Sequence, residues 1–204
     1  MQLIGMLDSP YVRRVAISMR LMGLPYRHNP LSVFRNYEEF RKINPMVKVP
    51  TLICDDGTVL LESSLIIEYL DSLVPSAKRL MPMQPGERLR ALRNTGVALA
   101  AFEKSVQRFY ELTLRPADKQ HAPWLERVTQ QMSAAFDELE RITAGANPWL
   151  HGERLMQDDV CAAVAWRFLQ FVMPGVLEPA RYPSLAAYSV RAEALPEFLA
   201  TPLD

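Results

Sequence analysis

The sequence predicts a small α/β domain followed by an all-helical domain. In the first third of the chain, short β-rich runs alternate with helical patterns, whereas no run is typical of a strand beyond residue 75. Pro75, Pro82 and Pro85 stiffen the segment where this character changes. We therefore predict a first domain over residues 1–76, a linker over 77–86 and a helical domain over 87–204.

The first domain is predicted to begin with a βαβ unit. Residues 2–7 form a short apolar run that is typical of a buried strand. Ser9 and Pro10 then open a helix, because Ser is a favoured N-cap and Pro is tolerated at the first helical position. Gly23 ends this helix. A second strand is predicted over residues 26–33, at a sheet edge because Pro30 interrupts it.

The remainder of the first domain is predicted to be ββα. A short helix is expected over residues 37–43, and β-rich runs follow at 51–54 and 58–61. The sequence Asp55-Asp56-Gly57 between these runs is a hairpin signal, because Gly adopts positive φ. A helix should then run from Ser63 or Ser64 to residue 73.

The second domain is predicted to contain helices over residues 87–114, 124–142, 158–173 and 184–195. The second of these is amphipathic, with apolar residues at steps of three or four: Leu125, Val128, Met132, Phe136, Leu139 and Ile142. The third is apolar nearly all round, which is typical of the central helix of a bundle.

Composition excludes several classes of protein. Lys plus Arg and Asp plus Glu each number 23, so the formal net charge of zero argues against a general affinity for nucleic acid or an anionic membrane. The two distant cysteines, Cys54 and Cys161, indicate reduced thiols and a cytoplasmic location. The first residues lack a basic region followed by a long apolar core, so no signal peptide is predicted.

Several kinds of catalytic site also lack their sequence patterns. His28, His121 and His151 lie far apart without Cys or carboxylate partners at ligand spacing, so we predict no metal site. The chain contains neither a phosphate-binding Gly-rich motif nor a G-x-S-x-G elbow, which argues against nucleotide enzymes and serine hydrolases.

Four stretches carry a resemblance to a known family: SPYVRRV at 9–15, INPMVKVPTL at 43–52, LESSLIIEYLD at 61–71 and YPSLAAYSVRAEALPEFLAT at 182–201. In this order and spacing, the chain resembles the soluble glutathione transferases along nearly its whole length. The resemblance implies a thioredoxin-like N-terminal domain, a C-terminal helical bundle, a cytoplasmic homodimer and glutathione as co-substrate in detoxification. The SPY stretch is similar to Ser-type members, which include the tau, theta and zeta classes, and bacterial-style relatives.

The resemblance also implies which residues bind glutathione. The Val49-Pro50 bond is expected to be cis, so that the backbone of Val49 pairs with the tripeptide; the alternative is a rigid turn that binds nothing. Ser63 is expected to hold the γ-glutamyl carboxylate at a helix N-terminus, while Glu62 meets the ammonium. Ser63 is also expected to cap this helix, with Ser64 as a competing cap, and the alternative to anion binding is that capping is its only role.

Two cations are candidates for the glycyl carboxylate of glutathione. Lys48 is the first, although a solvated surface lysine is an equally good interpretation. Arg35, in the loop after the second strand, is the weaker candidate.

Ser9 is the predicted catalytic residue. A thiol of pKa near 8.5 is only about 3% ionised at pH 7, and lowering that pKa by two units requires about 2.7 kcal/mol. A hydroxyl donor to a charged acceptor contributes about 1.5–3 kcal/mol and a helix N-terminus about 0.3–1 kcal/mol. Ser9 can supply both effects, and Tyr11 is a rival donor. The alternative is that Ser9 only caps the helix.

An apolar pocket for the electrophile is expected to draw on both domains. Its candidate residues, for which a core position is the alternative, are Leu7, Tyr11, Phe34, Leu99, Phe102, Val106 and Tyr110.

One departure from the family concerns the helix over 158–173, where Met156 stands at the usual Ser or Thr cap position three residues before Asp159. Gln157 or Asp158 is a candidate replacement for the missing cap.

Conjugation of glutathione to small electrophilic apolar substrates is the function that the resemblance implies. A glutathione-dependent isomerase or dehalogenase is the first alternative, although the Ser-Ser-Cys run of zeta-class isomerases is missing. A non-catalytic regulatory protein on the same fold is the second. Thiol–disulfide reductase activity is disfavoured, because Ser rather than Cys stands at position 9.

Overall fold

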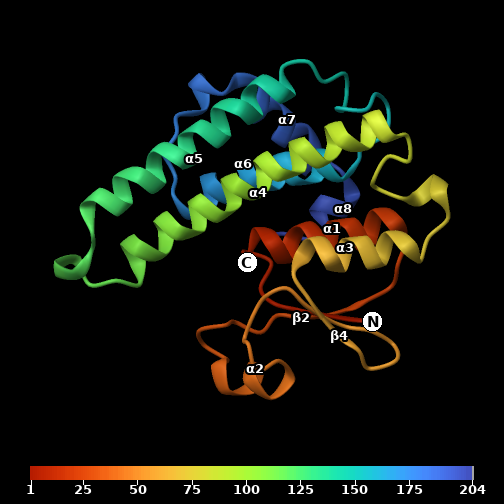
Figure 1. Cartoon of the computed structure of the whole chain (residues 1–204), viewed down its shortest axis with the longest axis horizontal. Coiled ribbons are helices and arrows are strands. Elements are labelled where there is room, and N and C mark those ends of the chain that lie inside the picture. Colours follow the sequence, from red (N-terminus) through yellow and green to blue (C-terminus); the bar gives the residue numbers. More distant parts are fainter. Residues whose placement is uncertain (204) are drawn as a thin grey trace. The chain divides into compact units, whose positions relative to one another are not determined.

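The computed structural model describes residues 1–203, and these divide into two compact units (Figure 1). The first unit comprises Met1–Met81 together with the residues from Ala194 onward, and the second comprises Pro82–Glu193. The C-terminal segment belongs to the first unit because it packs on the first helix: the buried Arg13 donates from Nε to the Thr201 carbonyl at 2.9 Å.

The first unit contains a mixed sheet of strand order β2-β1-β3-β4. The strands are β1 (Gln2–Ile4), β2 (Arg27–Asn29), β3 (Thr51–Ile53) and β4 (Val59–Leu61). β1 runs parallel to β2 and antiparallel to β3, which in turn pairs antiparallel with β4. The predicted βαβ-ββα order is therefore confirmed, with β2 at an edge. The strands are shorter than predicted, and β1 ends where Gly5 adopts a φ of 134°.

The helices of the first unit are α1 (Pro10–Met22), α2 (Tyr37–Ile43), α3 (Ser63–Ser72) and the short α8 (Pro196–Leu199). Ser9 caps α1 as predicted, and Gly23 ends it with a left-handed φ of 71°. α1 packs against α3, and the two helices begin at the same end of this unit (Figure 1). Both helix N-termini therefore lie at the same end of the helix pair.

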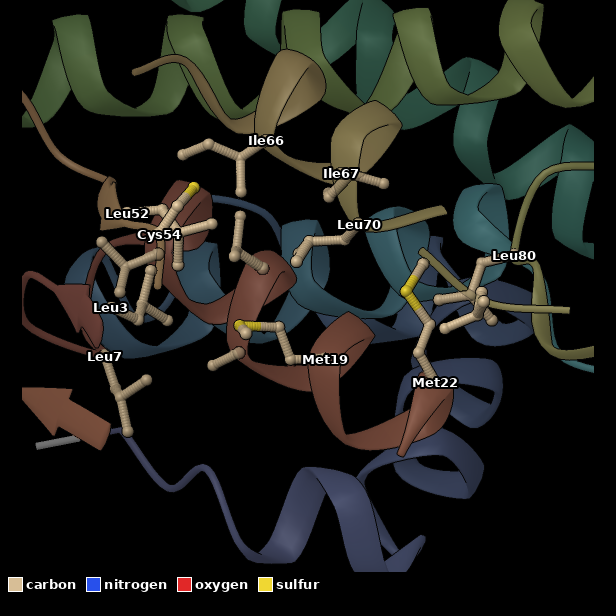
Figure 2. Packing of buried hydrophobic residues seen from close by; sticks show 14 residues of the cluster. Leu3, Leu7, Met19, Met22, Leu52, Cys54, Ile66, Ile67, Leu70 and Leu80 are labelled. Carbon is tan, nitrogen blue, oxygen red and sulfur yellow. The ribbon is translucent and has the colours of Figure 1, made fainter. Parts of the chain in front are cut away.

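A hydrophobic cluster holds α1 and α3 on the sheet (Figure 2). Leu3 and Leu52 contribute from paired positions of β1 and β3. Met19 of α1 and Ile66 and Leu70 of α3 are fully buried in the same cluster. Burying large aliphatic side chains contributes about 1.5–3 kcal/mol each, so this cluster holds both helices against the sheet.

The second unit is a bundle of α4 (Pro85–Thr113), α5 (Ala122–Thr143), α6 (Gln157–Val172) and α7 (Pro183–Glu193). Short 3-10 turns, η1 (Ser76–Lys78), η2 (Ala117–Lys119) and η3 (Pro179–Arg181), lie outside these helices. α6 packs on both α4 and α7 and is buried along most of its length, as its all-round apolar sequence predicts. Among residues 1–203, no helix has the length and apolarity needed to cross a membrane.

The α6 N-terminus retains a carboxylate cap despite Met156. The backbone N–H of Met156 donates to Oδ2 of Asp159 at 2.6 Å, and that of Leu150 donates to Oδ1 at 2.8 Å. Asp158 is not the replacement cap, because its Oδ2 accepts hydrogen bonds from Asn94 and His151. Burial and the neighbouring charge of Asp158 raise the pKa of Asp159 to about 6.

Candidate active site

Ser9 combines a capping position with an unused donor. Its backbone is extended, with φ −71° and ψ 122°, and its Oγ accepts from the Val12 N–H at 3.5 Å, a long hydrogen bond. Within the described residues, the Ser9 hydroxyl donates to no recorded acceptor. Because capping uses only a lone pair, the hydrogen of the half-buried Ser9 hydroxyl remains available to a sulfur placed beside the helix N-terminus.

Gly5 brings the start of α1 close to the loop that carries Val49. A Cβ on Gly5 would lie 2.6 Å from Cγ2 of Val12 and 2.9 Å from Cγ1 of Val49, so only Gly permits this approach. Val12 is the residue whose N–H Ser9 caps. Two of the predicted site elements, the α1 N-terminus and the loop around Val49, are therefore neighbours.

The loop around Val49 is held from beneath by two polar side chains that the sequence analysis missed. The Val49-Pro50 peptide bond is cis, as the resemblance implied. The buried Asn44 donates from Nδ2 to Thr51 Oγ1 at 2.9 Å, and Thr51 Oγ1 donates to the Lys48 carbonyl at 2.7 Å. Asn44-Pro45 is a turn signal, but sequence alone does not reveal that this Asn is buried.

The two candidate cations for the glycyl carboxylate lie at the surface of the first unit. The Lys48 side chain is exposed on the loop before Val49. Arg35 is exposed too, with Nη2 at 3.8 Å from the sulfur of Met6. Both remain predictions.

Glu62, rather than Ser63 or Ser64, caps α3. Glu62 has a φ of 68°, and its Oε2 accepts from the backbone N–H groups of Ser64 at 3.0 Å and Leu65 at 3.3 Å. The expectation of a Ser cap was therefore wrong. A carboxylate is the better acceptor at this position because it also complements the positive end of the helix. Ser63 is the first helical residue, and its Oγ donates to Glu62 Oε1 at 3.2 Å.

A buried arginine that the sequence analysis also missed lies beneath this cap. Arg14 of α1 is 1% exposed, and its Nη1 donates to Ser63 Oγ at 3.3 Å and Ser64 Oγ at 3.4 Å. The signal in the sequence is a pair of adjacent arginines between the apolar residues Val12 and Val15. The first turn of α3 is thus fixed to α1 by polar contacts.

The predicted acceptor residues differ in exposure. In the first unit Leu7 is buried, Tyr11 is half-buried and Phe34 is 55% exposed. In the second unit Leu99 and Val106 are half-buried and Tyr110 is exposed. Phe102 is fully buried, so it lies in the core, which was the alternative to a place in the pocket. The described part of the chain contains no cluster of His, Cys, Asp or Glu that could hold a metal ion.

Comparison with known proteins identifies the family. The model of the glutathione S-transferase N-terminal domain matches residues 3–78, and that of the C-terminal domain matches residues 122–191. A probable maleylacetoacetate isomerase of Vibrio cholerae is 30% identical over 96% of this chain and 92% of its own length. The chain belongs to the glutathione S-transferase family.

Solved structures of the transferase family superpose closely on this chain. One is a glutathione S-transferase from Methylobacterium radiotolerans in complex with glutathione sulfonate, with a TM-score of 0.90 and 30% identity over 98% of this chain and 93% of that one. Another is a glutathione transferase family member from Pseudomonas fluorescens with bound S-(propanoic acid)-glutathione, with a TM-score of 0.81 and 28% identity over 98% of each chain. The thioredoxin-like fold of the first unit and the helical second unit are those of the transferases.

Proposed function

We propose that this transferase binds glutathione and conjugates its thiolate to small electrophilic, apolar substrates, with Ser9 as the catalytic residue. The observation that carries the proposal is the geometry of Ser9, whose Oγ accepts at the α1 N-terminus while its hydrogen has no recorded acceptor among residues 1–203. A thiolate placed there would receive a hydroxyl hydrogen bond and the positive end of the helix, which together stabilise the anion. The pKa of the bound thiol should therefore fall.

The proposed position of glutathione follows from the elements around Ser9. The backbone of Val49 would pair with the cysteinyl part of the peptide. The γ-glutamyl group would lie at the α3 N-terminus, with its ammonium near Glu62 and its carboxylate at Ser63. Lys48, or Arg35, would meet the glycyl carboxylate. The two related structures each hold a glutathione derivative, which supports this choice of co-substrate.

The proposed electrophile is apolar. Tyr11 and Phe34 provide partly exposed aromatic surface in the first unit, which supports the choice. Leu7 of the first unit stays a prediction for this surface, and Leu99, Val106 and Tyr110 of the second unit stay sequence-based candidates.

Glutathione-dependent isomerisation is the second candidate, favoured by the name of the Vibrio cholerae relative. The same thiolate would add to an unsaturated substrate, a bond would rotate, and the carbon–sulfur bond would break to return glutathione. In a dehalogenase the thiolate would instead displace a halide ion. A regulatory, non-catalytic role would leave the hydroxyl of Ser9 without a chemical task.

The test is a titration of the protein with glutathione, followed by product analysis with an aryl halide and with a cis-unsaturated diketo acid. Conjugation predicts a rise in ultraviolet thiolate absorbance and a stable thioether product. Isomerisation predicts turnover of the diketo acid without consumption of glutathione. If glutathione neither binds nor forms a thiolate, both enzymatic proposals are wrong.

We also propose that the chain is a cytoplasmic homodimer. Leu65, Tyr69 and Leu73 recur every four residues, and each has an exposed side chain. Such a stripe of exposed apolar surface is typical of an interface between chains. Light scattering of the purified protein should give twice the mass of 23.2 kDa, and replacement of Leu65 and Tyr69 by Glu should give the monomer.

A further inference from the structure

A short C-terminal strap, residues 196–201, returns to the first unit and packs on α1 (Figure 1). It consists of α8 and the two residues that follow it. Thr201 closes the strap from a buried position: its Oγ1 donates to the Glu197 carbonyl at 3.0 Å, and its backbone N–H donates to the Phe198 carbonyl at 3.0 Å. The strap therefore has a local structure of its own that can hold a neighbouring helix.

Arg13 joins α1 to this strap. Its side chain is 1% exposed, its Nε donates to the Thr201 carbonyl at 2.9 Å, and its guanidinium lies over the ring of Phe198, 5.8 Å from the centroid. A buried cation is costly unless polar groups and aromatic faces receive it, so these contacts hold Arg13 in one place. The strap and α1 are thereby fixed to each other.

The backbone of Arg13 also holds Ser9. The Arg13 N–H donates to the Ser9 carbonyl at 2.9 Å, which is the hydrogen bond with which α1 begins. The other hydrogen bond of Ser9 to this turn is weaker, because the Val12 N–H lies 3.5 Å from Ser9 Oγ. The position of Ser9 therefore depends on how firmly residues 12 and 13 are held.

We infer that Arg13 is a positioning residue for the Ser9 hydroxyl and that the C-terminal strap acts on Ser9 through it; this rests on the catalytic role proposed for Ser9 above. Helix ends fray, and a catalytic donor that is displaced by about 1 Å loses much of its effect on the reacting atom. Two contacts from outside α1 prevent such movement here. Val12 packs against the Gly5 backbone, and Arg13 is bonded to Thr201.

The experiment measures the pKa of the thiol of bound glutathione from its ultraviolet absorbance across pH, together with kcat and KM for conjugation. Arg13→Gln should raise this pKa and lower kcat at pH 7 by about 3- to 10-fold, which corresponds to a pKa change of about half to one unit. The KM for glutathione should change little, because Arg13 is not part of the proposed glutathione site. Arg13→Lys should restore part of the loss, since it returns the charge without the planar donor set.

Arg20→Gln is the matched control on the same helix. Arg20 also lies over an aromatic ring, that of Tyr26 at 5.7 Å, but it is exposed and belongs to the last turn of α1. This variant should leave the pKa of the bound thiol unchanged. If Arg13→Gln lowers the free energy of unfolding in urea but likewise leaves that pKa unchanged, Arg13 has only a structural role and the inference is overturned.

Phe198→Leu tests the strap by a smaller substitution, in case Arg13→Gln does not fold as judged by circular dichroism. Because Phe198 is the aromatic partner of Arg13, this variant should also raise the pKa of the bound thiol. An unchanged pKa in Phe198→Leu would contradict a role for the strap.

A double variant shows whether Arg13 acts through Ser9. Ser9→Ala combined with Arg13→Gln should have the same thiol pKa as Ser9→Ala alone, because no hydroxyl is left to position. A further shift in the double variant overturns the inference and leaves the proposed function standing. If Ser9→Ala by itself does not change the thiol pKa, the catalytic role of Ser9 is wrong and the inference falls with it.

Discussion

The N-termini of α1 and α3 lie at the same end of the first unit and are capped in opposite ways. At α1 a neutral hydroxyl accepts one long hydrogen bond of 3.5 Å, and its own hydrogen is not used. At α3 a carboxylate accepts from two backbone N–H groups and from the Ser63 hydroxyl. The α1 cap contributes little to stability and leaves a donor for a ligand. The Glu62 carboxylate stabilises α3, and a ligand that uses the same donors must displace it.

The largest expected effect concerns Gly5, which holds the α1 N-terminus against Val49. Gly5→Ala should lower the free energy of unfolding by about 2–6 kcal/mol, because its strained φ and its overpacked Cβ each cost about 1–3 kcal/mol. Gly57→Ala is the control, since it has a φ of 87° but nothing within 4 Å of its Cβ. Urea unfolding should give the smaller loss for Gly57→Ala; equal losses would contradict the close approach at Gly5.

The second prediction extends the comparison to a third helix N-terminus, that of α6, where the carboxylate cap is buried. The pKa of Asp159 is about 6 in the folded chain, whereas the ordinary pKa of an Asp, which applies to the unfolded chain, is 3.8. Between these values the folded state holds a proton that the unfolded state has lost, so stability falls as pH rises from about 4 to about 6. A shift of about two units corresponds to about 3 kcal/mol.

Urea unfolding across this pH range, compared with the same series for Asp159→Asn, measures that effect. The difference in unfolding free energy between the wild type and Asp159→Asn should change by about 3 kcal/mol over this range. The wild type should lose stability relative to the variant as the pH rises toward neutral. Parallel pH profiles would mean that Asp159 titrates at its ordinary pKa.

The third prediction separates capping from catalysis at α1. In Ser9→Ala the pKa of the bound thiol should return toward 8.5, which lowers the thiolate fraction and hence kcat/KM at pH 7 by about 25-fold. Its stability should fall by only about 0.5 kcal/mol, the low end for a cap. Stopped-flow thiolate absorbance and the pH profile of conjugation measure the change. Ser9→Thr, which keeps a hydroxyl, is the control, and an unchanged rate in Ser9→Ala would exclude Ser9 as the thiol's partner.

The smallest expected effect is at α3. Glu62→Gln keeps an acceptor but removes the charge, so the unfolding free energy should fall by about 0.3–1 kcal/mol. Glu68→Gln, at an exposed position of the same helix, is the matched control and should change little. Thermal melts of the two variants measure this difference, and Glu62→Gln should have the lower midpoint. Equal midpoints would mean that the charge of Glu62 does not stabilise α3.

Local signals in the sequence predicted much of the fold. Ser9, Pro10 and Gly23 marked the ends of α1, and Asp55-Asp56-Gly57 marked the hairpin, because caps and turns depend on the backbone preferences of a few adjacent residues. The functional site was predicted from the family resemblance rather than from these signals. The choice of Ser63 as the α3 cap failed because a φ of 68° at Glu62, which no pattern indicated, brings its carboxylate onto the first turn.

The sequence by itself determined the order of the strands and of the long helices and the ends of α1, and its resemblance to a family supplied the candidates Ser9, Val49, Glu62 and Ser63. Only the tertiary structure decided that Arg14 lies under Ser63, a contact between residues 49 positions apart. It also decided that Asn44 and Thr51 are buried beneath the loop around Val49. The physical reason is that caps and periodicity act over one turn of helix, whereas burial of a polar group depends on which distant segment supplies its hydrogen-bond partner.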